Sequence, residues 1–179
     1  MAPQGATVAH GLSSALEFYI IKNRDSGFSW TGYHAGKGAE HYIQLDSSGA
    51  ATSTDDWNDT APTSSVFTVS GDEGRINKNG TAYIAYCFHS VEGYSKFGSY
   101  TGNGNANGTF VYTGFRPAWV MFKNTANTFD WQMFDTARET INPIDNDLHA
   151  NQDAAEGENN PTDFLSNGFK LRGTENNTN

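Results

Sequence analysis

Three carboxylates beside a tryptophan are the first residues in this chain that could do chemistry. Asp55, Asp56 and Asp59 flank Trp57 in the stretch STDDWNDT. Paired carboxylates next to an aromatic ring are found in glycosidases, and also in lectins that stack a sugar on an indole. The spacing does not establish that two of the carboxylates converge, so the stretch favours sugar contact over catalysis. Trp57 and the three aspartates are the candidate ligand-binding residues.

A second acidic stretch offers oxygen atoms to a metal ion. Asp145 and Asp147 are followed by three more acidic residues up to Glu158, which is a composition that suits calcium. The order of an EF-hand loop is not met, because His149 and Ala150 stand where a ligand and its glycine turn are needed. A solvated acidic loop is therefore the favoured interpretation, and Asp145 and Asp147 are the candidate metal ligands.

Glycines crowd the stretch SYTGNGNANGTFVYTGF between positions 99 and 115. A phosphate-binding loop would need a helix directly after it, because the helix N-terminus supplies the N–H groups that hold the anion. Here the aromatic and β-branched residues Phe110, Val111 and Tyr112 follow instead. The stretch is typical of a long turn between two strands.

The chain shows no other motif of catalysis. Its five histidines have no metal-binding spacing, and no G-x-S-x-G nucleophile motif is present. Cys87 is the single cysteine, which excludes an intrachain disulfide. We expect a protein that is not an enzyme and that uses no cofactor.

Composition indicates the fold class. Aromatic residues make up 13% of the 179 residues and charged residues 17%, and glycine, asparagine, threonine and serine are plentiful. This is the profile of an all-β protein with many turns. A net charge of −9 argues against nucleic acid or an anionic membrane as a partner. No apolar run approaches the length needed to insert into a membrane.

The chain nearly repeats itself, which indicates how its strands are organised. GLSSALEFYIIKNRDSGFSWTGYH begins at Gly11 and GFRPAWVMFKNTANTFDWQMFD at Gly114, and SSVFTVSG from Ser64 resembles SNGFKLRG from Ser166. In the first block, matched residues are separated by 101 positions: Lys22 and Lys123, Asn23 and Asn124, Phe28 and Phe129, Trp30 and Trp131, Tyr33 and Phe134. We expect a jelly-roll-like β-sandwich made of two related halves.

The repeat predicts three segments. Residues 1–98 form the first β-repeat with its closing strand, 99–109 a Gly/Asn-rich connector, and 110–179 a second repeat that lacks the closing strand. A missing strand would leave backbone N–H and C=O groups unpaired at a sheet edge. Either the chain is a fragment, or another segment or subunit completes the sheet.

The central run AYIAYCFHSVEGYSKFGSYTGNGNANGTFVYTGFRPAWVMFKN resembles an uncharacterised β-rich domain of virion proteins from marine tailed phages, including cyanophages and pelagiphages. KNRDSG, DWNDTAPTSSVFTVSG and DFLSNGFKLRG also fit that family, so the resemblance covers nearly the whole chain. In the family this domain often follows a laminin-G or concanavalin A-like module in tail or fibre proteins. We expect this chain to depart from the family pattern by lacking that module.

The resemblance implies a phage virion structural protein, part of a tail fibre or surface appendage. It would work by oligomeric assembly and host-surface adhesion, on the outside of the particle after synthesis in the host cytoplasm. Its partners would be other virion proteins and copies of itself, in a trimer or a polymer. The alternative is a carbohydrate-binding module that recognises host surface glycan through Trp57 and the nearby carboxylates. A polysaccharide depolymerase is the least favoured function.

Overall fold

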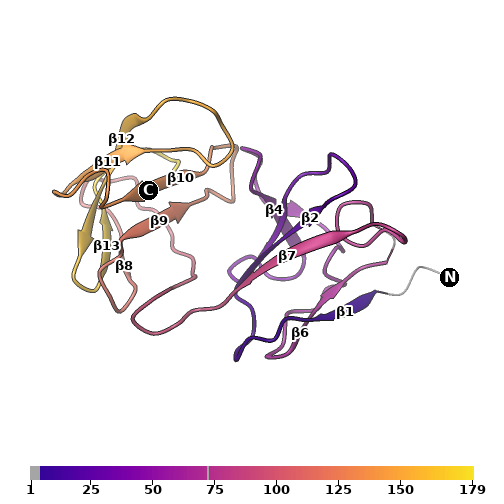
Figure 1. Ribbon diagram of the computed structural model, residues 1–179. Helices are drawn as coiled ribbons and strands as arrows, with labels where there is room; N and C mark the ends of the chain where they lie inside the picture. Colours follow the sequence, from indigo (N-terminus) through magenta and orange to yellow (C-terminus); the bar gives the residue numbers. More distant parts are fainter. Residues whose placement is uncertain (1–4, 72) are drawn as a thin grey trace. The chain divides into compact units, whose positions relative to one another are not determined.

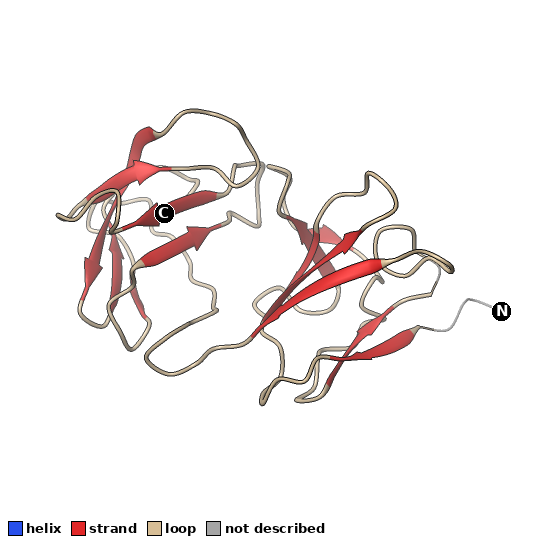
Figure 2. Ribbon diagram, in the orientation of Figure 1, coloured by secondary structure: helices blue, strands red, loops and turns tan. Residues whose placement is uncertain are grey.

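The computed structural model describes residues 5–71 and 73–179, and it confirms the prediction of an all-β protein. The described residues form thirteen strands and no helix (Figure 2). In chain order the strands are β1 (Ala6–Ala9), β2 (Phe18–Asn23), β3 (Thr31–His34), β4 (His41–Gln44), β5 (Thr52–Ser53), β6 (Val66–Val69), β7 (Tyr83–Phe88), β8 (Phe110–Tyr112), β9 (Trp119–Phe122), β10 (Gln132–Asp135), β11 (Ile144–Asp147), β12 (Gly157–Leu165) and β13 (Gly168–Leu171) (Figure 1).

The strands belong to two compact units. Of the described residues, the first unit holds 5–47 and 51–90, and the second holds 48–50 and 91–179. Residues 99–109, which the sequence suggests as a connector, lie wholly within the second unit.

The first unit contains a five-stranded antiparallel sheet in the order β5-β4-β3-β2-β7, and a separate pair of strands, β1 and β6. β2 lies inside the sheet. It pairs with β3 from Phe18 to Ile21, and with β7 along all six of its residues. The aromatic and aliphatic residues of β2 alternate between the two faces of the sheet, and all four, from Phe18 to Ile21, are buried.

An aromatic cluster joins the two layers of this unit. The Tyr19 ring on β2 lies 4.7 Å from Phe67 on β6, 4.9 Å from Tyr33 and 5.0 Å from Trp57, measured between ring centroids. All four side chains are buried. Offset and edge-on contacts of this kind add to the free energy gained from burying the rings.

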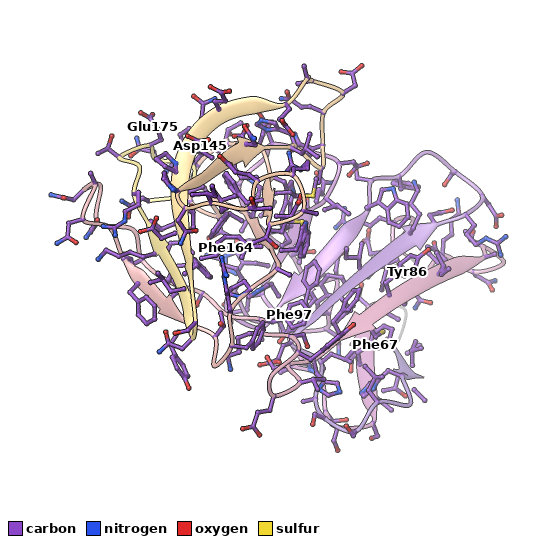
Figure 3. The ribbon with its side chains drawn as sticks, turned by 60° about the vertical axis from the view of Figure 1, so that its left-hand side comes forward. Phe67, Tyr86, Phe97, Asp145, Phe164 and Glu175 are labelled. Atoms are coloured by element: carbon purple, nitrogen blue, oxygen red, sulfur yellow. The ribbon has the colours of Figure 1, made fainter. Side chains whose placement is uncertain are left out.

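The second unit has a four-stranded antiparallel sheet in the order β11-β12-β13-β8, and the strand pair β9 and β10. Its core contains Phe122, Phe134, Ile144, Phe164, Phe169 and Leu171. Phe122 on β9 contacts Phe169 on β13 at 5.3 Å, so the strand pair packs against the sheet. Figure 3 labels one core residue of each unit, Phe67 in the first and Phe164 in the second.

The Lys-Asn pairs at the ends of β2 and β9 share three hydrogen bonds. The side-chain oxygens of Asn23 and Asn124 each accept hydrogen bonds from the backbone N–H groups two and three residues later, at 2.9 and 3.0 Å. Lys22 Nζ and Lys123 Nζ each donate to the carbonyl oxygen of the phenylalanine six residues later. Both strands therefore end in an Asx-type turn closed by a lysine.

The two units differ beside these matched strands. Whereas β2 pairs with β3 and β7, β9 pairs with β10 alone among the described strands. The side of β9 that corresponds to the β7 side of β2 therefore has no neighbouring strand in the described part of the chain.

Candidate functional site

Trp57 is a core residue of the first unit. Its side chain is 0% exposed, and its ring packs edge-on against Tyr19 and Tyr33. The indole Nε1 donates a 2.9 Å hydrogen bond to the His41 carbonyl oxygen, which satisfies the one polar group of the ring. The expectation that Trp57 stacks against a sugar is corrected, because no ring face reaches the surface.

Asp56 is committed to an internal ion pair. Its carboxylate is fully buried and accepts two hydrogen bonds from Arg75, at 2.6 Å from Nε and 2.7 Å from Nη2. The guanidinium group also lies over the Tyr42 ring, 4.9 Å from its centroid. The hydrogen bond to Asp56 raises the pKa of Arg75, so the guanidinium group keeps its positive charge. Asp56 is therefore structural.

The other two aspartates of this stretch lie at the surface. Asp55 and Asp59 are exposed, and Asn58 and Asp59 have φ values of 52° and 48° in a tight turn. The backbone N–H of Asn58 closes that turn on the Asp55 carbonyl oxygen at 2.7 Å. With Asp56 buried against Arg75, the three carboxylates do not face a common ligand.

Asp145 lies half-buried on β11 in an acidic neighbourhood (Figure 3). Burial raises its pKa, and the negative charges of Glu139, Glu158 and Asp147 raise it further. Glu139 Oε2 accepts hydrogen bonds from the backbone N–H groups of Asp145 and Asn146, at 2.7 and 3.1 Å. The Glu139 carboxylate therefore already holds the backbone of β11.

Asp147 is buried at the end of β11, and its Oδ1 atom has no hydrogen-bond partner. Burial raises its pKa, and His149 opposes that shift. The His149 ring lies between two carboxylates, with Nε2 3.9 Å from Asp147 Oδ2 and Nδ1 3.9 Å from Asp130 Oδ2. The side-chain amide oxygen of Gln132 lies in the same region, and it too is buried without a hydrogen-bond partner.

Neither acidic region gathers a ligand set. Among residues 5–71 and 73–179, no three histidine, cysteine, aspartate or glutamate side chains lie close enough together to hold a metal ion. A calcium ion takes six to eight oxygen ligands, so Asp145 and Asp147 together supply a small part of what it requires. A shallow hollow beside β9 and β10, lined by Arg116, Pro117, Ala118, Thr136 and Thr140, brings no carboxylate or imidazole.

The surface carries large apolar side chains that the sequence reasoning missed. Tyr94, Tyr112 and Trp119 are 82%, 65% and 53% exposed, and Ile84 and Tyr86 project from β7. Tyr86 is labelled in Figure 3. The sequence gives no signal of this exposure, because Phe18 and Trp119 are both aromatic at matched positions of the repeat and differ only in their neighbours in the structure.

Together these features define an all-β protein with two aromatic cores and exposed apolar side chains on its strands. The chain belongs to the family described as a domain of unknown function (DUF7483), whose model matches residues 2–179. No curated protein and no solved structure matches it. Within the described residues, no helix has the length and apolar character needed to cross a membrane.

Proposed function

We propose that this protein is a structural component of a phage virion, in a tail fibre or another surface appendage. It works by assembling with copies of itself and with other virion proteins, and by adhering to the host surface. Packing and hydrogen bonding carry out this function, without catalytic turnover. The assignment to a phage virion rests on the resemblance of the central run to a domain of marine tailed-phage virion proteins.

One observation supports the assembly role best. Apolar side chains on β7 and β9 are exposed, and both strands are unpaired on one side among the described strands. Soluble monomers usually protect such strands with charges, proline or bulges, because unpaired edges recruit other strands. Here β7 and β9 contain no charged residue and no proline.

The solution mass of the chain tests this proposal. Light scattering after size exclusion, over a hundredfold range of concentration, should give a mass above the 19.5 kDa of one chain. A trimer or an open-ended polymer would support the assembly role. A monomer at every concentration would contradict it.

A carbohydrate-binding module is the second candidate, on different residues from those the sequence suggested. The Tyr94 and Tyr112 rings are the most exposed aromatic rings of the second unit, and an exposed ring can stack against a sugar. A glycan array should then show binding that falls in Tyr94→Ala or Tyr112→Ala and persists in Tyr94→Phe. Equal signals from all of these variants would exclude sugar stacking at these rings.

A further inference from the structure

The edge of β9 that faces away from β10 has the properties of a strand-binding site. Residues Trp119–Phe122 pair with β10 along one side, and no described strand occupies the other. On the matched strand β2, the corresponding side is filled by β7, in antiparallel register from Phe18–Phe88 to Asn23–Tyr83. The first unit therefore shows which kind of strand fits beside this sequence.

Trp119 provides a second, independent observation. It stands 101 positions after Phe18, the spacing of the repeat. Phe18 is 6% exposed and its ring stacks on that of Phe88 from β7, with centroids 5.9 Å apart. Trp119 is 53% exposed. An added strand with an aromatic side chain would bury the indole as β7 helps to bury Phe18.

Three other sheet edges, those of β5, β8 and β11, are protected in ways that β9 is not. β5 has two residues, and β8 has three. β11 carries Asp145 and Asp147, with an irregular register between Ile144 and Asn146. Short strands, edge charges and bulges all discourage pairing with another chain. The sequence WVMF of β9 has none of these features.

β7 of a second copy is the occupant that these features favour. β7 is the last strand of its own sheet, so its outer side, along residues 84–87, is also unpaired among the described strands. Its sequence YIAYCF is uncharged, and Ile84 and Tyr86 are exposed on it. In the first unit β7 pairs with β2, and β9 stands at the position of β2 in the repeat. A strand with the sequence of β7 therefore suits the open side of β9.

We propose that the outer edge of β7 in one copy pairs antiparallel with the outer edge of β9 in the next, with Trp119 covered by aromatic side chains of β7. This inference rests on the proposed assembly function and specifies its interface. Each copy carries one β7 edge and one β9 edge, so the contact is head-to-tail. Such contacts form a ring where the rotation closes, and otherwise a filament.

Charge substitutions at the two edges test the interface. Trp119→Lys and Tyr86→Lys each place a lysine at one edge, and each should weaken self-association at least tenfold by light scattering. Tyr112→Lys is the matched control, because it also replaces an exposed ring but lies on β8. It should associate as the wild type does. Circular dichroism and thermal unfolding verify that each variant folds.

Mixing the two edge variants gives the decisive result. Trp119→Lys keeps an intact β7 edge and Tyr86→Lys keeps an intact β9 edge, so an equimolar mixture should form a one-to-one dimer that grows no further. A wild-type oligomer that neither variant weakens, or a mixture that stays monomeric, would overturn this interface while leaving the assembly function in place. A wild type that is monomeric at all concentrations would overturn both.

Discussion

At the scale of single residues, the buried ion pair of the first unit makes the clearest prediction. Arg75→Met leaves the Asp56 carboxylate buried without its positive partner, whereas Asp56→Asn leaves an arginine that is 29% exposed and can regain water. We expect Arg75→Met to lower the free energy of unfolding by about 3–5 kcal/mol and Asp56→Asn by less. Urea denaturation measures both.

The exposed pair of Arg172 with Asp163 is the control for this effect. Its arginine is 41% exposed, so Arg172→Met should change the free energy of unfolding by less than about 1 kcal/mol. Equal losses of unfolding free energy in Arg75→Met and Arg172→Met would show that the burial of Asp56 does not determine the size of the loss.

The acidic neighbourhood of Asp145 predicts a pH dependence. Burial and the nearby carboxylates raise its pKa in the folded protein, so the folded state holds this proton more tightly than the unfolded chain does. Stability from this group is therefore present below the unfolded pKa, about 3.9, and is lost as the pH rises through the folded value. Above that value the charge destabilises the fold.

Asp145→Asn removes that charge. The variant should be more stable than the wild type at pH 7, by less than about 1 kcal/mol for a half-buried group, and the gain should vanish near pH 3. Urea denaturation at pH 3, 5 and 7 measures the difference. Asp55→Asn, at an exposed position, should show no such trend, and a similar gain there would refute the assigned cause.

At the scale of elements, the turn after β9 depends on one side chain. Asn124 Oδ1 accepts two backbone hydrogen bonds, and its Nδ2 donates to the Asn176 carbonyl oxygen at 2.5 Å. Asn124→Ala removes all three bonds, and Asn124→Asp keeps the acceptor. We expect a loss of about 1–3 kcal/mol for alanine and a smaller one for aspartate. Thermal unfolding ranks the two, and the reverse order would contradict the role of Oδ1.

The same scale explains why the edges of β7 and β9 matter. A strand with a neighbour along each edge and a strand with only one neighbour can share one sequence pattern. The pattern shows which faces of the strand are apolar, and not which of its edges are paired. β2 and β9 are such a pair. Their neighbours along the sheet account for the difference between a buried Phe18 and an exposed Trp119.

At the scale of the whole molecule, net charge opposes the proposed assembly. Each copy carries a charge of −9, so copies repel one another at low ionic strength, while the proposed contact is apolar. We expect self-association to strengthen when sodium chloride rises from about 20 mM to about 500 mM, because salt screens the repulsion. Sedimentation velocity at both concentrations measures the change. Dissociation by salt would indicate an interface held by ion pairs instead.

The sequence alone determined the all-β class and the spacing of the repeat. These features depend on local backbone preference and on the order of apolar residues, and both are present in the sequence itself. The burial of Trp57 and Asp56 was determined by the tertiary structure. STDDWNDT has the composition of an exposed binding loop, yet Tyr19 and Tyr33 enclose its indole and Arg75 binds its central carboxylate. Those partners lie far away in the chain, and burial depends on which distant residues pack against a side chain. The unpaired side of β9 likewise could be identified only from the strand pairing in the tertiary structure.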